Sequence, residues 1–315
     1  AQNYSPTTWN GSIDQVRIYS SALSSGDVTK LYNESADVPT TNLVAHYKLD
    51  GNAEDVLDTY DGTASNVTYS AGVYGGTPTN VNFLGMAFQP DLVWIKSRNA
   101  PADHTLTDSV RGVQQLLSSN TAAAEGNQSP YGLTAFGSNG FTVSDVSGGG
   151  AGVNGASGGT NSGTPPNYVA WCWKAGGAAV SNTDGSITSQ VSANTDAGFS
   201  IVKYTGNSTA GATVGHGLSE IPQMIIVKRL STPIDNWAVY NETIGNTKRL
   251  ALDENAAATP SGRLEWNSTT PTNTVFTLGN HSAVNQTSDY IAYCFHSVDG
   301  YQKVGSYTGT GTSSN

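Results

Sequence analysis

The chain has 315 residues, a net charge of −10 and only 14 Lys and Arg residues. Because binding to a phosphate backbone needs clustered basic side chains, this composition excludes nucleic acid as an expected partner. No apolar run approaches the ~18 residues that a membrane-spanning helix needs, so we expect no membrane insertion. The 36 Gly residues and the short runs of Val, Tyr and Trp predict an all-β fold made of tandem β-sandwich modules.

Two segments near the start of the chain have strand character. Residues 11–24 (GSIDQVRIYSSALS) resemble the terminal strand of laminin-G/concanavalin-like jelly rolls, and residues 43–53 (LVAHYKLDGNA) resemble the opening strand of another such domain. The resemblance implies that residues 1–38 are the C-terminal segment of one jelly roll and residues 39–72 a partial segment of the next. Since isolated strand pairs are marginal in water, we predict that both segments pair with other chains or with a part of the protein outside this sequence; such intertwining favours a homo-oligomer, with a trimer preferred.

Oxygen-bearing side chains cluster after the second segment, at Asp50, Asn52 and Asp55. Jelly rolls of this resemblance often hold Ca²⁺, and hard oxygen ligands suit that ion, so these three residues are the candidate metal ligands. The alternative is a solvated turn.

Three tyrosines, Tyr60, Tyr69 and Tyr131, lie in polar sequence that is typical of loops. A tyrosine combines an apolar ring with a polar tip and is therefore suited to surface contacts. These tyrosines are the candidate binding residues.

Four blocks of sequence recur in one order, which predicts a duplicated module: copy 1 in residues 73–178 and copy 2 in residues 198–300. The polar residues 179–197 are expected to form a linker, and residues 301–315 a closing strand or the start of a further module. The matching blocks are 89–96 with 221–228, 118–124 with 253–259, 141–143 with 276–278, and 167–173 (NYVAWCW) with 289–295 (DYIAYCF).

The last block has apolar residues on both faces of a strand, which indicates a central strand covered on both sides. We therefore expect Trp171 and Trp173, together with Trp94, to pack in the core rather than stack on sugars. Cys172 and Cys294 occupy the same position in the two copies, so they are expected to be buried free thiols. Residues 106–117 fit a short helix or a strand pair, and their periodicity does not decide between the two.

A G-x-S-x-G pattern occurs at residues 155–159, inside the glycine-rich stretch 148–163. A nucleophile elbow needs a strand before it and a helix after it, so we interpret the stretch as a mobile loop without a site. No two of the five histidines are spaced i, i+4, and there is no Cys-x-x-Cys motif, which argues against a zinc site. The sequence predicts no catalytic residue and no cofactor apart from the Ca²⁺ considered above, so we expect no enzyme.

The duplicated module resembles a domain of tail and fibre proteins of marine bacteriophages, especially those of cyanobacteria. The resemblance implies a structural virion protein with jelly-roll-like modules, such as a tail fibre or a capsid-decorating fibre. Such a protein would assemble in the host cytoplasm and lie on the particle surface. Its partners would be other virion proteins and a host cell-surface glycan or receptor. The residues that carry the resemblance are 90–96, 108–112, 168–177 and 204–218.

Two alternatives stay open at this point. The first is a bacterial surface adhesin or carbohydrate-binding module. The second, less favoured, is a depolymerase tailspike, which usually needs a pair of carboxylates in a cleft, and the sequence offers no persuasive pair.

Overall fold

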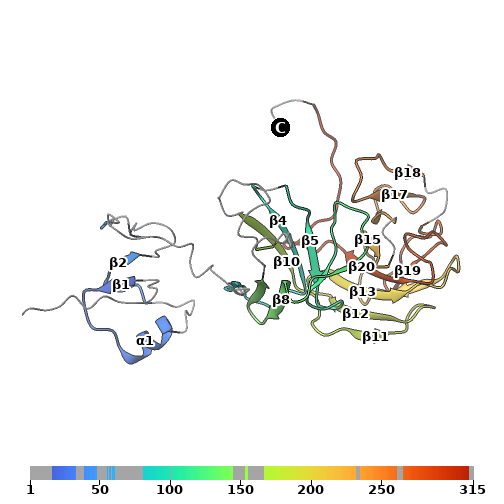
Figure 1. Cartoon of the computed structure of the whole chain (residues 1–315). Coiled ribbons are helices and arrows are strands. Elements are labelled where there is room, and N and C mark those ends of the chain that lie inside the picture. The colour runs from blue at the N-terminus through green and yellow to red at the C-terminus, as the bar shows by residue number, and fades with distance from the viewer. Residues whose placement is uncertain are drawn as a thin grey trace, which may run out of the picture. The chain divides into compact units, whose positions relative to one another are not determined.

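The computed structural model describes residues 16–32, 39–47, 55, 57, 59–60, 81–99, 101–144, 153–154, 167–231, 235–260 and 265–311. The chain divides into two compact units, Ala1–Thr79 and Asn80–Asn315. The described residues form 20 strands and one short helix, and every named strand pair is antiparallel. This confirms the all-β fold class (Figure 1).

The first unit contains a two-stranded sheet and a helix. Strand β1 (Val16–Tyr19) pairs with β2 (Leu43–Tyr47), and helix α1 (Ser25–Tyr32) lies between them in the sequence. The helix begins with a reciprocal cap, because the Asp27 amide donates to Ser24 Oγ and the Ser24 hydroxyl donates to Asp27 Oδ2. The two jelly-roll-like segments therefore pair with each other at these strands, where we had expected partners from other chains. The trimer stays a prediction.

Copy 1 is a sandwich of two three-stranded sheets. One sheet has the strand order β10-β4-β5 and the other the order β3-β9-β8, and a small strand pair, β6-β7, accompanies them. The backbone of Leu106 pairs with that of Leu117, so the region left open in the sequence is a strand pair and not a helix. The bounds are β3 (Val81–Phe83), β4 (Leu92–Ser97), β5 (Thr105–Asp108), β6 (Gln115–Leu116), β7 (Gly126–Asn127), β8 (Gly132–Gly137), β9 (Gly140–Ser144) and β10 (Tyr168–Trp173).

In copy 2 an eight-stranded sheet packs against a two-stranded antiparallel sheet, which is formed by β14 (Thr213–Gly215) and β19 (Val275–Thr277). The eight strands follow the order β11 (Val180–Asn182), β12 (Ser189–Asn194), β13 (Phe199–Thr205), β20 (Asp289–Phe295), β15 (Met224–Arg229), β16 (Ala238–Asn241), β17 (Lys248–Ala251) and β18 (Thr259–Pro260).

The two copies share one topology in one register. In copy 1, Cys172 of β10 lies opposite Val93 of β4, and in copy 2 Cys294 of β20 lies opposite Ile225 of β15. The third strand, β5 or β16, pairs on the far side of β4 or β15 in the matching register. The prediction that the repeated blocks share a fold is confirmed.

Residues 179–197 differ from the linker that we expected, because they carry β11 and β12, two strands of the copy 2 sheet. The reason is a short alternation, in which Ser189 and Val191 are buried while Gln190 is exposed. At the other end, residues 303–311 form no strand; Val304 still packs against a hydrophobic core, and the chain beyond it leads away from the sheets toward the C-terminus in Figure 1.

Strand β20 has a neighbour on each side, β13 and β15, whereas the described residues place only β4 beside β10. The side chains of the two strands therefore differ in solvent exposure. Trp171 of β10 is 45% exposed, while its counterpart in β20, Tyr293, is 1% exposed. The expectation that Trp171 lies in the core was therefore wrong, and Cys172 is only partly buried, while Cys294 is buried as expected.

We predict unequal reactivity of these two free thiols. Burial raises the pKa of Cys172 to about 11 and that of Cys294 to about 12, so both thiols should react slowly in the native protein. Cys172 should be labelled first, since only Cys294 is fully covered. Pulsed thiol labelling followed by peptide mass spectrometry measures the order. Equal native rates would contradict the prediction, and unfolded protein, which takes two labels, is the control.

Each copy has an inner core between its two layers, and a third core lies between the copies. Val93, Ile95 and Val143 belong to the inner core of copy 1, and Ile225, Val227 and Phe276 to that of copy 2. In the glycine-rich stretch 148–163, only residues 153 and 154 are described, and Val153 is 2% exposed in the copy 1 core. The stretch therefore contributes to packing at this residue, which the mobile-loop interpretation had missed.

One fully buried histidine, His216, is expected to affect the stability of the fold in acid. His216, after β14, is fully buried; its Nε2–H donates to the Thr272 carbonyl, and its Nδ1 accepts from the Leu218 amide. Burial lowers the pKa of His216 from 6.5 to about 4, although the Thr272 carbonyl opposes the shift.

This pKa difference predicts a loss of stability in acid. Between pH 6.5 and about 4, His216 is protonated in the unfolded chain but stays neutral in the folded protein. Its contribution to the free energy of unfolding is therefore complete above pH 6.5 and is lost as the pH falls toward 4. The loss should reach about 3 kcal/mol. Denaturant unfolding over this range measures it, and His216→Gln, which does not titrate, should flatten the decline. An identical decline in the variant would contradict the assignment.

Candidate functional site

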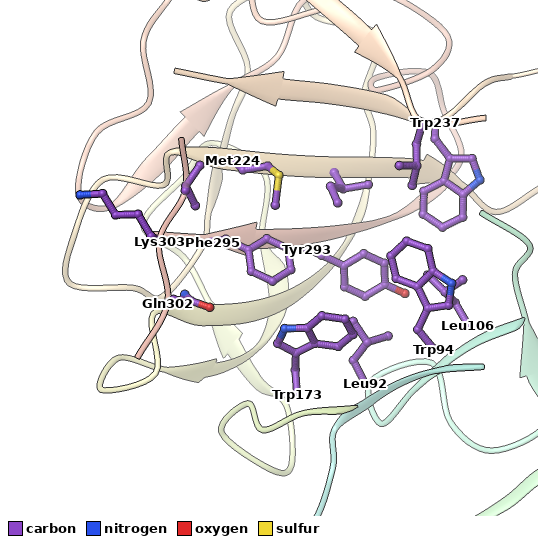
Figure 2. Close-up of a pocket in the computed structure, with 13 residues that line it drawn as sticks. Leu92, Trp94, Leu106, Trp173, Met224, Trp237, Tyr293, Phe295, Gln302 and Lys303 are labelled. Carbon is purple, nitrogen blue, oxygen red and sulfur yellow. The ribbon is translucent and has the colours of Figure 1, made fainter. Parts of the chain in front are cut away.

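The core between the copies defines an interface that we call the seam. Both copies use the same sheet face there: Leu92 and Trp94 of β4 on one side, Met224 and Ile226 of β15 on the other. A pocket of about 230 Å³ opens within the seam (Figure 2). Its lining residues come from both copies and from the C-terminal segment, and are Leu92, Trp94, Leu106, Trp173, Met224, Ile226, Trp237, Leu252, Tyr293, Phe295, Gln302, Lys303 and Val304.

Three of the four aromatic side chains in the lining that carry a polar atom use it in a hydrogen bond to another protein group. Trp94 Nε1 donates to His104 Nδ1 at 2.8 Å, and Trp237 Nε1 donates to the carbonyls of Ser118 and Thr121. The Tyr293 hydroxyl donates to Asp108 Oδ2 at 2.8 Å. These groups therefore present ring carbon to the pocket and hold their polar tips outside it.

The pocket is mainly apolar and opens to solvent at one end. Water gains little there, because a buried water needs two to four polar partners and the walls are apolar. The pocket has the concave, mainly apolar form of a ligand site.

The floor of the seam is held by a buried ion pair. Arg111 Nε lies 2.5 Å from Asp108 Oδ2, and both side chains are at most 1% exposed. Arg111 also pairs with Glu125 at 3.0 Å and contacts the Tyr293 hydroxyl at 3.5 Å. Burial alone would lower the pKa of Arg111, but Asp108 leads the charges that raise it, so the guanidinium stays charged. The copy 1 turn is thereby joined to the central strand of copy 2.

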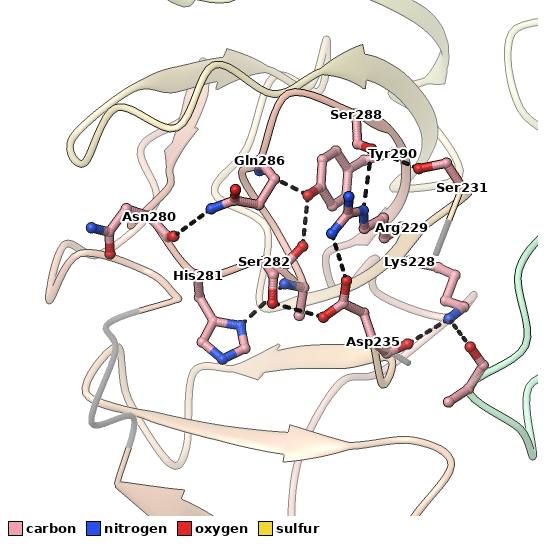
Figure 3. Close-up of polar contacts among 12 residues, drawn as sticks. Lys228, Arg229, Ser231, Asp235, Asn280, His281, Ser282, Gln286, Ser288 and Tyr290 are labelled. Atoms are coloured by element: carbon pink, nitrogen blue, oxygen red, sulfur yellow. Dashed lines mark hydrogen bonds and ion pairs between the residues drawn. The ribbon is translucent and has the colours of Figure 1, made fainter. Parts of the chain in front are cut away.

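A second contact docks the residue 118–125 loop of copy 1 onto copy 2. The Lys228 amine donates to the Ala122 carbonyl at 2.8 Å and to the Asp235 carbonyl at 2.5 Å. Asp235 is held in turn by Arg229 and by the Ser282 hydroxyl (Figure 3). These hydrogen bonds fix the 118–125 loop of copy 1 against copy 2.

The tyrosines singled out in the sequence do not line this pocket. Tyr60 is 56% exposed in the first unit, where its carbonyl accepts from the Tyr47 hydroxyl. Tyr131 lies in the second unit, partly buried, in a turn where its amide donates to the Gln128 carbonyl. Tyr69 lies outside the described residues. The exposure of Tyr60 is compatible with a surface contact.

The candidate calcium ligands have a different outcome. Asp50 and Asn52 lie outside the described residues. Asp55 is 4% exposed, and its carboxylate accepts hydrogen bonds from the amides of His46, Leu57, Thr59 and Tyr60. The His46 amide contributes most to lowering the pKa of Asp55. The geometry of Asp55 is that of a turn-forming residue that ties its loop to β2. Within the described ranges, no group of three His, Cys, Asp or Glu residues is arranged to hold a metal ion.

Sequence reasoning missed the pocket itself. Trp94 and Trp173 were assigned to the core, Met224 and Phe295 were placed in repeated apolar strands, and Trp237 was not singled out. The available signal was the same-face alternation of apolar residues in 92–96 and 224–228, which places Leu92 and Trp94 beside each other on one surface.

One comparison with known proteins gives a match. A family model described as "Domain of unknown function (DUF7483)" matches residues 63–315, a span that contains both copies. No curated protein and no solved structure matches the chain. In the part of the chain that the structure describes, no helix is both long and apolar enough to cross a membrane.

Proposed function

The chain belongs to the DUF7483 family, and we propose that it is a non-enzymatic binding subunit of a virion appendage, a tail fibre or a capsid-decorating fibre. It would present its β-sandwich modules to a host cell-surface glycan or receptor while other virion proteins hold it on the particle. Several copies on one particle, for example in a trimeric fibre, would convert weak single contacts into avidity.

The observation that carries the binding role is the seam pocket. Two sandwiches fixed to each other hold an aromatic-lined cavity in which Lys303 is the one charged residue among the described residues of the lining. None of these described lining residues is a carboxylate, histidine or thiol, the groups that most often act as acid, base or nucleophile. The virion setting is supported by the resemblance of residues 90–96 and 168–177 to marine phage tail and fibre domains.

A census of purified particles tests the virion assignment. Mass spectrometry of density-purified virions of a phage that encodes the chain should find it at a fixed copy number relative to the major capsid protein. Its absence from particles, or a variable trace amount that washing removes, would overturn the proposal.

Two further measurements address the alternatives. A surface adhesin should carry a secretion or anchoring signal in its full gene, and finding one would favour that class. A depolymerase should clear a capsule overlay, so clearing by the purified chain would overturn the non-enzymatic assignment.

A further inference from the structure

We propose that the seam pocket binds the hydrocarbon chain of a single-chain anionic amphiphile, with the head group at Lys303. This deepens the proposed binding function by naming a ligand class for the pocket and rests on that function only for the role of the site. The shared chemistry is an alkyl chain joined to an anionic head, as in a free fatty acid or a lysophospholipid.

The walls favour hydrocarbon over sugar. A glycan needs hydrogen-bonding partners, but the polar atoms of Trp94, Trp237 and Tyr293 already bond protein groups. The Gln302 amide donates to the carbonyls of His296 and Gly198, so its donors are also engaged. An apolar cavity of about 150 Å³ in another protein binds benzene, and this pocket, at about 230 Å³, is larger. Its contents are therefore expected to be hydrocarbon.

The mouth favours a negative head group. Lys303 is exposed, and Figure 2 shows its amine pointing outward at the end of the pocket away from Trp237. No ion pair joins Lys303 to another described residue, and the chain as a whole carries a charge of −10. A cation at the open end of an apolar pocket is complementary to an amphiphile whose chain enters first.

Titration calorimetry of the 315-residue protein with octanoate, decanoate and dodecanoate tests whether the pocket binds an alkyl chain. Affinity should rise by about fourfold for each added methylene and level off once the pocket is full, with one ligand bound per chain. Val304→Trp, in the pocket lining next to Lys303 in the sequence, should weaken decanoate binding at least tenfold, while Val180→Trp, at an exposed position outside the pocket, should leave it unchanged. No saturable binding, or unchanged affinity in Val304→Trp, would overturn the proposal.

The head group is tested by charge reversal. Lys303→Glu should weaken decanoate binding by about fivefold or more and leave decanol binding unchanged, since surface charge pairs contribute modestly. Lys248→Glu, an exposed reversal outside the pocket lining, is the matched control. Equal affinity of Lys303→Glu and the native chain for decanoate would overturn the role of Lys303.

A comparison of decanoate with lysophosphatidylglycerol identifies which class of amphiphile supplies the alkyl chain. Tighter binding of decanoate points to a free fatty acid, and tighter binding of the lysolipid points to a lipid; both outcomes support the shared chemistry. Binding of a soluble oligosaccharide that competes with decanoate would contradict the hydrocarbon assignment. The result is independent of the virion census, so the two proposals can fail separately.

Discussion

Replacing Arg111 with isoleucine is expected to lower the free energy of unfolding of the second unit by about 3–5 kcal/mol, because the change leaves Asp108 buried without its cation. Asp108 is fully buried and the Arg111 side chain is 1% exposed, so water cannot replace the lost partner. Denaturant unfolding followed by tryptophan fluorescence measures the loss. Because Arg111 also contacts Tyr293, the variant should in addition loosen the seam.

The chain supplies its own control for this experiment. The same turn in copy 2 has Ile244 in place of Arg111 and Asn241 in place of Asp108. Asn241 Oδ1 accepts from the Thr243 amide as Asp108 Oδ1 accepts from the Val110 amide. The double variant Arg111→Ile/Asp108→Asn gives copy 1 the uncharged turn of copy 2, so it should recover part of the loss. A double variant whose loss equals the sum of the two single losses would show that the charges are not coupled.

Replacing Trp237 with alanine is expected to cost a similar 3–5 kcal/mol, since the indole is fully buried in the seam. Its Nε1–H holds the carbonyls of Ser118 and Thr121 across the interface, and both would lose this donor. The 118–125 loop should therefore detach before the inner cores melt. Hydrogen exchange of that loop, together with the unfolding free energy, measures both effects.

Trp266→Ala is the matched control, because Trp266 is equally buried but belongs to the inner core of copy 2. It should reduce stability by a comparable amount while the 118–125 loop keeps its protection under native conditions. Equal loss of protection in the two variants would argue against a specific anchoring role for Trp237.

The repeat and its strand register were predictable because they depend on local alternation. The blocks at residues 168–173 and 290–295 have the same order of large and small apolar residues, and a shift of one residue would exchange their faces. The strands at 180–182 and 189–194 were missed since their residues are mostly polar and small, and only Val191 marks the buried side. β12 forms through pairing with the next strand, β13, which is apolar, and β11 pairs in turn with β12, so both depend on neighbouring strands more than on their own composition.

The candidate site was harder to predict than the fold. In β4 and β15 both faces are apolar, so the sequence does not indicate which face meets its own sandwich and which meets the other copy. The pocket exists only after two surfaces from distant parts of the chain are brought together. Asp55 shows a related difficulty: a carboxylate in a polar loop suits a metal, and composition does not indicate that this carboxylate accepts hydrogen bonds from four backbone amides.

The packing of like face on like face in the seam is the geometry of an isologous dimer, in which both subunits use one patch. Here the two partners are covalently linked, so their association proceeds at the effective concentration set by the connection and does not depend on protein concentration. Because the two copies are parts of one polypeptide, they need not be identical, and each can carry different residues at equivalent positions. Copy 1 carries the buried cation Arg111, and copy 2 carries the indole of Trp237. A symmetric pair would repeat every contact twice, whereas the pocket described in the seam has two different walls.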